Sequence, residues 1–89
     1  MTWTIKFDDR AKKEFKRLDK HTQRTIIRYL RERIESSNNP RQYGKSLSAN
    51  KTGLWRYRIG DYRLVCAIQD NELVVLVLRV THRRHVYDD

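Results

Sequence analysis

Three arginines lie close together in this chain and have the right chemistry to handle a phosphate group. Arg56 and Arg58 are separated by one residue, and Arg63 follows shortly after them. The guanidinium group is a planar fork that stays charged and matches the oxygens of a phosphate. Fixed positive charge of this kind stabilises the negative charge that develops when a phosphodiester is attacked. The three arginines therefore indicate binding or cleavage of a phosphodiester.

The arginines fall in a predicted β-hairpin. Gly60-Asp61 is a glycine-first pair of the kind that closes two-residue turns. Such a turn places Arg58 directly opposite Arg63 on the neighbouring strand. Like charges opposite each other destabilise a sheet, which favours a bound anion between them. The plainer interpretation is a solvated strand face whose charges discourage further strand pairing.

Alternation along the strand separates the arginines from the aromatic residues around them. Arg56 and Arg58 are expected on one face of the sheet, and Trp55, Tyr57 and Ile59 on the other. We interpret Trp55 and Tyr57 as core residues rather than platforms for nucleic-acid bases.

The C-terminal residues add groups that could transfer protons. His82 and His85 carry imidazole rings, the side chain most often used for general acid–base work. Arg83 adds charge, and Tyr87 could stack on a base or bind a phosphate. Together with the arginines, this set suits metal-independent RNA cleavage, in which the 2′-hydroxyl attacks the neighbouring phosphodiester. The simpler interpretation of these residues is an exposed, solubilising tail.

Other kinds of site find no support in the sequence. There is no Cys/His cluster with zinc spacing, no pair of carboxylates on one predicted face and no glycine-rich phosphate loop. No Gly-x-Ser-x-Gly motif supports a Ser-His-Asp triad. The single cysteine, Cys66, lies in an apolar strand and is expected to be a core residue. We expect no metal and no cofactor.

Length and charge limit the fold and the partners. The 89 residues predict one domain with a thin core, residues 1–89, because 35% of the residues are charged and only 38% are hydrophobic. A net charge of +9 favours nucleic acid or an acidic protein as partner. No segment is long and apolar enough to cross a membrane, and charged residues interrupt the N-terminus where a signal peptide would be apolar. A cytoplasmic protein is expected.

The elements that position these residues follow from their apolar patterns. Residues 2–7 alternate as a half-buried strand, and Asp8 or Asp9 is expected to cap a helix with an apolar stripe. Thr22 is the expected cap of a second helix, which ends before Pro40. The apolar positions predicted for the two helices are Ala11, Phe15, Leu18, Ile26, Ile27, Leu30 and Ile34.

The second half of the chain predicts a sheet. Residues 41–53 are expected to form a loop held by Leu47, and strands are expected at 54–59, 62–69 and 73–80, with Asp70-Asn71 in the second turn. The fold class is therefore α+β, in the order β-α-α-β-β-β, with an antiparallel sheet packed on a two-helix hairpin. The last strand is apolar on both faces and belongs near the centre of the sheet. The first strand could lie at an edge or beside that central strand.

The first helix also carries a basic surface, which continues into the second helix. Such a surface is usually only solvated, but it suits contact with RNA phosphates. Its residues are Lys12, Lys13, Lys16, Arg17 and Lys20.

The run from Gly53 to Val65, GLWRYRIGDYRLV, together with the ending His82-Arg83 and Val86-Tyr87, resembles the RelE/ParE superfamily of bacterial toxins. The similarity covers nearly the whole chain and is greatest to the RelE/StbE-type mRNA interferases. It implies a microbial-ribonuclease-like fold that cleaves mRNA in the ribosomal A site and is inhibited by an acidic, RelB-like antitoxin. It also implies binding to ribosomal RNA through the basic helix and His85, and contact with operator DNA only through the antitoxin.

Carried over by motif, the family's functional positions fall on Arg56, Arg58, Arg63, Arg83 and Tyr87. Some members have lysines where this chain has Arg56 and Arg58. Because arginine does not give up its proton, the general base cannot be carried over, and His82 becomes the first candidate, with His85 the second.

Two other functions remain open at this point. ParE-type members share the architecture but inhibit DNA gyrase without cutting RNA. A basic binding module, or an inactive toxin retained for antitoxin and operator binding, would also fit a chain that lacks a lysine or glutamate base.

Overall fold

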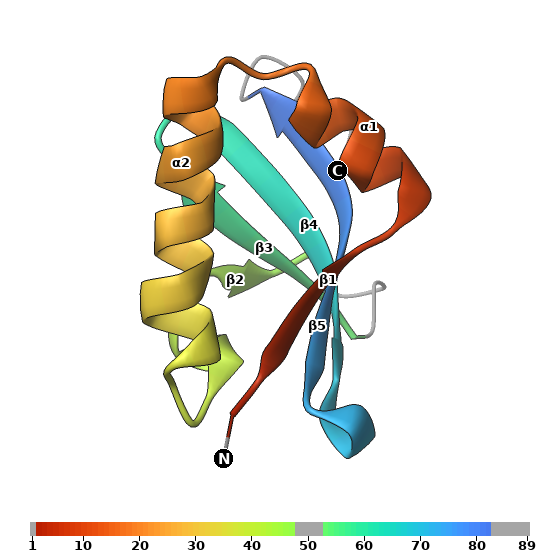
Figure 1. The fold of residues 1–89 in the computed structure, drawn as a ribbon. Helices are drawn as coiled ribbons and strands as arrows, with labels where there is room; N and C mark the ends of the chain where they lie inside the picture. The colour runs from red at the N-terminus through yellow and green to blue at the C-terminus, as the bar shows by residue number, and fades with distance from the viewer. Residues whose placement is uncertain (1, 48–52, 83–89) are drawn as a thin grey trace.

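Two helices cover one face of a five-stranded sheet in the computed structural model, which describes residues 2–47 and 53–82 (Figure 1). This arrangement confirms the predicted α+β class. None of the helices in these two segments is long and apolar enough to cross a membrane. The elements are β1 (Thr4–Phe7), α1 (Asp9–Lys16), α2 (Lys20–Tyr29), η1 (Leu30–Glu35), η2 (Pro40–Gln42), β2 (Lys45–Ser46), β3 (Leu54–Ile59), β4 (Tyr62–Gln69), η3 (Asp70–Glu72) and β5 (Val74–His82).

The sheet is mixed rather than wholly antiparallel. Its strand order is β1-β5-β4-β3-β2, and the pairs among β2 to β5 are antiparallel as predicted. β1, however, pairs with β5 in parallel. No tight turn joins these two strands, so the chain is free to bring β1 back in the same direction as β5. β1 therefore lies both at an edge and beside the long apolar strand, which is inside the sheet.

Aspartates cap both helices. The Asp8 side chain accepts a hydrogen bond from the Ala11 backbone N–H at 2.9 Å and caps α1. This confirms the prediction that Asp8 or Asp9 is the cap. The predicted cap of the second helix, Thr22, is wrong. Asp19 caps α2 instead, and accepts from both the backbone N–H and the hydroxyl of Thr22. Both oxygen types can cap a helix, and the aspartate begins the helix earlier than expected.

The core lies between the helices and the sheet face that they cover. Ala11, Ile26, Leu30 and Ile34 from the helical side are buried, while Ile27, Phe15 and Leu18 are only partly buried. Buried sheet residues that meet them are Tyr57, Ile59, Leu64, Cys66, Ile68, Val75, Val77 and Val80. The prediction that Tyr57 is a core residue is confirmed. Trp55 is partly buried and packs against the core.

The segment predicted as a loop contains a short helix and a strand. The Tyr57 hydroxyl donates to the Pro40 carbonyl oxygen at 2.6 Å, and the Trp55 Nε1–H donates to the Tyr43 carbonyl oxygen at 2.6 Å. These two bonds hold the segment against β3, and β2 then pairs with β3. The predicted anchor Leu47 is buried.

A β-bulge in β5 changes which side chains face the helices. Val65 pairs with Arg79 but Cys66 pairs with Val77, so β5 carries one extra residue, Leu78. The extra residue reverses the alternation that follows it. Val80 is therefore buried opposite Leu64 on the core face.

Glu14 of α1 holds the C-terminal part of β5. Beyond the last β1 pair, Phe7 with Val77, the edge of β5 is open to α1. One carboxylate oxygen of Glu14 accepts from the Val80 backbone N–H at 2.7 Å, and the other accepts from Arg79 Nε at 3.0 Å. The Glu14 side chain is only 18% exposed, so these bonds are shielded from water.

Replacing Glu14 should test this contact. In Glu14→Ala the Val80 N–H and Arg79 lose their acceptor in a partly buried place, which should lower the free energy of unfolding by about 1–3 kcal/mol. Glu14→Gln keeps an acceptor and should lose less. Urea unfolding measures both, with the exposed Glu32→Ala as the control. Equal stability of Glu14→Ala and the control would show that the contact contributes nothing.

The predicted arginine pairing is present in the sheet. Gly60, with φ of +58°, closes the turn between β3 and β4, and Arg58 lies opposite Arg63. Directly opposed residues have their side chains on the same face, so the two guanidinium groups share the face that the helices do not cover.

This pairing predicts a variant that is more stable than the natural chain. Arg58→Glu replaces a like-charge pair by an opposite-charge pair and should raise the free energy of unfolding by about 0.5–1 kcal/mol. Arg28→Glu, an exposed helix substitution, makes the same change in net charge and is the control. Thermal or urea unfolding would contradict the prediction if Arg58→Glu were no more stable than this control.

Candidate phosphate-binding face of the sheet

The sheet face turned away from the helices carries the three predicted arginines, and we call it the arginine face. Arg58 is exposed and Arg56 partly exposed, whereas Arg63 is only 6% exposed. Thr81 of β5 lies opposite Arg63, and its hydroxyl donates to the Arg63 carbonyl oxygen at 3.5 Å. The structure thus brings the three arginines of β3 and β4 together on one face.

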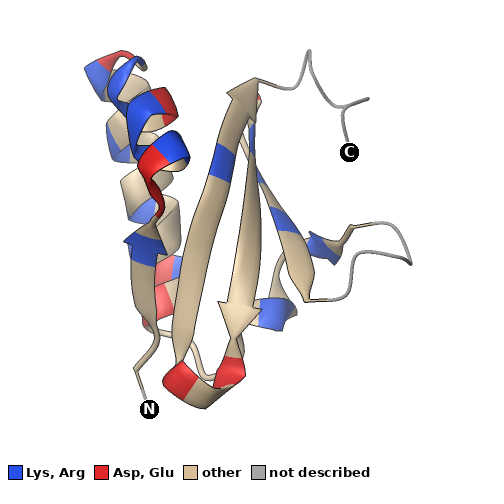
Figure 2. Ribbon diagram, turned by 90° about the vertical axis from the view of Figure 1, so that its right-hand side faces the viewer, with Lys and Arg blue, Asp and Glu red and all other residues tan. Residues whose placement is uncertain are grey.

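Charge is distributed unevenly over the sheet and its turns (Figure 2). All five strands carry lysine or arginine and none carries aspartate or glutamate. The acidic residues Asp70 and Glu72 lie in η3, which follows the end of β4 that is far from Arg63. Asp70 is engaged by Arg41 through two hydrogen bonds of 2.9 Å, which lower the pKa of its carboxyl. This carboxylate therefore neutralises Arg41 rather than the arginine face.

A cavity of about 280 Å³ borders the arginine face at the β2–β3 edge. Its lining residues are Tyr29, Gly44, Lys45, Arg56 and Arg58, none of which carries a carboxylate. Burial raises the pKa of the Tyr29 hydroxyl above its ordinary value, so this hydroxyl is neutral at physiological pH. Three cations and one neutral hydroxyl suit an anionic ligand.

Lys45 is a candidate binding residue that the sequence analysis missed. β2 places it opposite Arg56. A two-residue strand has no periodicity to detect, and the surrounding glycines and polar residues favour a loop. The only feature of the sequence that could have indicated a binding residue here is the lysine itself, which follows a glycine.

The structure does not bring His82 to the arginine face. His82 pairs with Tyr62, and their rings meet edge-on with centroids 5.2 Å apart. Tyr62 pairs with the buried Ile59, so this register position belongs to the core face. The β5 bulge is the physical reason, because unbroken alternation would have put His82 on the other face. The remaining tail predictions, Arg83, His85 and Tyr87, lie outside the described residues.

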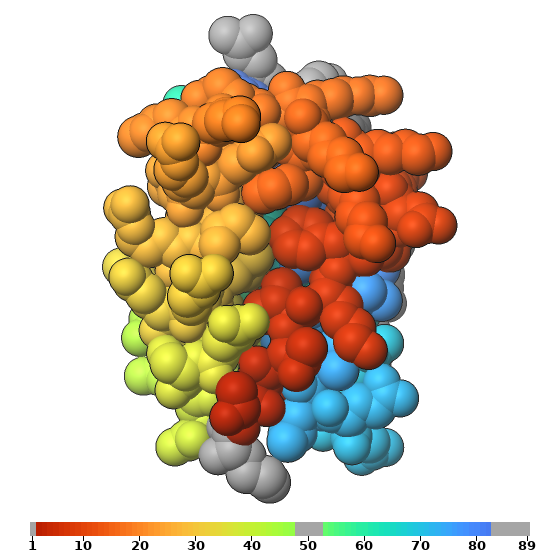
Figure 3. All heavy atoms as spheres, in the orientation of Figure 1, coloured from red at the N-terminus to blue at the C-terminus, as the bar shows by residue number. Residues whose placement is uncertain are grey.

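The predicted basic helix surface is a second, separate surface. Lys12, Lys13, Lys16, Arg17 and Lys20 are all exposed. They lie on α1, in the turn after it and at the first residue of α2, in the layer that covers the opposite face of the sheet (Figure 3). They therefore do not extend the arginine face directly.

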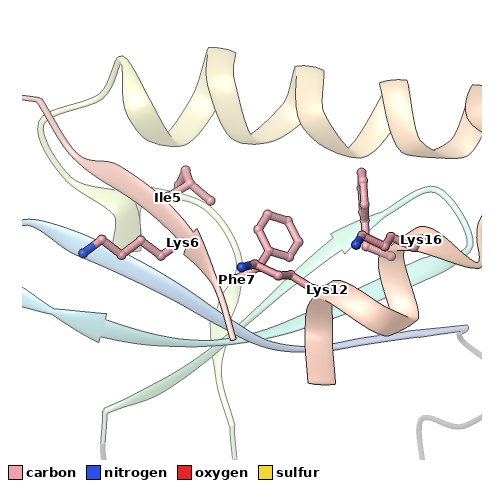
Figure 4. Close-up of a pocket in the computed structure, with 6 residues that line it drawn as sticks. Ile5, Lys6, Phe7, Lys12 and Lys16 are labelled. Carbon is pink, nitrogen blue, oxygen red and sulfur yellow. The ribbon is translucent and has the colours of Figure 1, made fainter. Parts of the chain in front are cut away.

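A groove between β1 and α1 has a different character (Figure 4). Ile5, Phe7 and Phe15 give it an apolar lining, with Lys6, Lys12 and Lys16 also contributing. An apolar floor does not suit a phosphodiester, so the arginine face is the better candidate for phosphate chemistry.

Cys66 does not supply a nucleophile. Its side chain is fully buried, and burial raises the pKa of the thiol far above its ordinary value. The thiolate that would react is therefore absent at physiological pH, and the predicted core role is confirmed.

Comparison with known proteins gives consistent results. Residues 5–87 match the family described as the ParE toxin of the type II toxin–antitoxin system parDE. The chain is 29% identical to Toxin RelG of Mycobacterium tuberculosis, with 98% of each protein covered.

Solved structures show the same fold. The RelBE2 toxin–antitoxin complex of M. tuberculosis contains a chain with a TM-score of 0.81 and 26% identity, with 93% of each chain covered. Isolated E. coli RelE gives a TM-score of 0.72 and 27% identity, covering 97% of this chain and 92% of RelE. An E. coli RelE double mutant bound to an antitoxin RelBc peptide gives a TM-score of 0.74 and 28% identity, covering 99% of this chain and 93% of the mutant RelE.

The match over residues 5–87 and the shared RelE-like fold lead to one conclusion. This chain belongs to the ParE toxin family of type II toxin–antitoxin systems, within the RelE/ParE superfamily.

Proposed function

We propose that this toxin is a metal-independent endoribonuclease that cleaves mRNA in the ribosomal A site and so inhibits translation. The observation that carries the proposal is the opposed pair of Arg58 and Arg63 on a sheet face that also holds Arg56. The relatives named RelG and RelE support it, since RelE-type toxins are ribosome-dependent ribonucleases.

In the proposed reaction, the 2′-hydroxyl gives its proton to water and attacks the adjacent phosphorus, which forms a 2′,3′-cyclic phosphate. The bond from phosphorus to the 5′ oxygen breaks, and this oxygen takes up a proton from water. Arg58 and Arg63 bind the phosphate oxygens and stabilise the extra negative charge of the transition state. Arg63 is nearly buried, so its charge acts in surroundings with little water to screen it. Arg56 adds a third charge, and Arg83 and Tyr87 remain predicted contributors.

The partners follow from the charge of the chain and from its relatives. We propose an acidic, RelB-like antitoxin, because the chain carries a net charge of +9 and related toxins were crystallised with RelB. The exposed basic residues of α1 are proposed to contact ribosomal RNA. The toxin contacts operator DNA only through the antitoxin. The proposed location of the toxin and these partners is the cytoplasm.

Inhibition of DNA gyrase without RNA cleavage is the second candidate. The description of the matched family as the ParE toxin of parDE favours it. The arginine face argues against it, because gyrase inhibition gives no reason to hold Arg58 opposite Arg63.

Toeprinting on a defined mRNA in programmed ribosomes distinguishes the two candidates. The natural chain should cut within the A-site codon, and Arg63→Ala and Arg58→Ala should each lose about 10²–10³-fold in rate. Arg58 is exposed, so its variant should fold even if the buried Arg63 cannot be replaced. Lys6→Ala is the control on another strand. An absence of cleavage together with inhibited gyrase supercoiling in a parallel assay would overturn the proposal.

His82→Gln tests whether this residue transfers the proton. Because the His82 ring packs against Tyr62 on the core face, we expect the cleavage rate to fall by less than about threefold, far below the contribution typical of a general base or acid. The pH dependence between pH 5 and 8 should also be unchanged. A loss of about 10²-fold, with the histidine-like inflection removed, would assign the proton transfer to His82.

A further inference from the structure

The arginine face contains a second pair of opposed cations. β2 pairs with β3 through Lys45 opposite Arg56 and Ser46 opposite Trp55. Lys45 and Arg56 therefore share a face, as Arg58 and Arg63 do. The uncovered face therefore presents two adjacent pairs of cations, Lys45 with Arg56 and Arg58 with Arg63.

The spacing of the two pairs suits a repeating anion. Arg56 and Arg58 are two residues apart on β3, which corresponds to about 6.7 Å along an extended strand. The two pairs also span neighbouring strand gaps, which are about 4.8 Å apart, so the centres of the pairs are separated by about 8 Å. The neighbouring phosphates of an extended single-stranded nucleic acid are separated by a comparable distance. A polyanion crossing β2, β3 and β4 could place one phosphate at each pair.

We propose that Lys45 and Arg56 form a second phosphate subsite, which binds the phosphate next to the one held by Arg58 and Arg63. Single-stranded RNA then runs obliquely across the hairpin, and Lys45 is a substrate-binding residue rather than a solvated edge lysine. This inference rests on the proposed function, which places the scissile phosphate at Arg58 and Arg63.

The backbone next to Lys45 lies close against β3. A Cβ atom on Gly44 would lie 2.3 Å from the Arg56 carbonyl oxygen, and Gly44 has a φ of +80°. Only glycine allows β2 to approach β3 so closely. The Tyr29 ring forms another wall of the cavity and is itself fixed, with Tyr57 at 6.0 Å and the Arg33 guanidinium at 5.1 Å. The cavity is therefore preformed rather than assembled by the ligand.

Binding of a fully 2′-O-methylated RNA hexamer tests the subsite, because this RNA cannot supply the attacking hydroxyl. Fluorescence anisotropy with the full chain should show about tenfold weaker binding for Lys45→Ala. The slope of log affinity against log salt should fall by about 0.7, because the variant neutralises one phosphate fewer on a single strand. Lys45→Arg should restore both. Lys6→Ala, an exposed lysine on the strand at the other edge of the sheet, is the matched control.

The outcomes separate this inference from the proposed function. If Arg58→Ala weakens binding but Lys45→Ala behaves like Lys6→Ala, the second subsite is wrong and the arginine site stands. If the natural chain does not bind the hexamer, or if Arg58→Ala binds as well as the natural chain, the second subsite is wrong. The proposed cleavage is decided separately, by toeprinting in programmed ribosomes.

Discussion

Because side chains alternate across a strand, the register between β3 and β4 decides which residues enter the core and which face outward. Gly60 sets this register by accepting a left-handed backbone conformation in the turn. A slip of one residue would turn Arg63 toward the helices and move Leu64 out of the core. Burial of Tyr57, Leu64 and Cys66 opposes such a slip. The core thus holds the arginines opposite each other despite their repulsion.

The apolar and polar sides of β3 support each other. On the core side, Trp55 and Tyr57 donate hydrogen bonds to the carbonyl oxygens of Tyr43 and Pro40. These bonds fix the segment that leads into β2, and β2 in turn borders the arginine face. A charged site of this kind is effective when its groups are already in position before the substrate arrives. The aromatic residues contribute to that preorganisation without touching the substrate.

Sequence patterns predicted most of the fold because the strands have strong alternation and a short turn between them. The ends of β3 and β4 agree with the predicted ranges, and so does the opposition of Arg58 and Arg63. Asp19 and Thr22 are both good helix caps, so local chemistry could not choose between them. The parallel direction of β1 depends on long-range packing, which leaves no local signal. The candidate site was predicted only in part, because β2 is two residues long and the β5 bulge inverts the face of His82.

The pairing of β1 with β5 has a consequence for synthesis of the toxin. Thr4 pairs with Val74, so the first strand of the chain has no neighbour in the described sheet until the last strand has been made. Contacts between such distant residues form slowly, because the entropy of closing the intervening chain is lost first. β5 also lies between β1 and β4, so a nascent chain without it lacks the strand that joins β1 to the rest of the sheet. The toxin is therefore unable to complete this sheet on the ribosome that makes it until β5 has emerged.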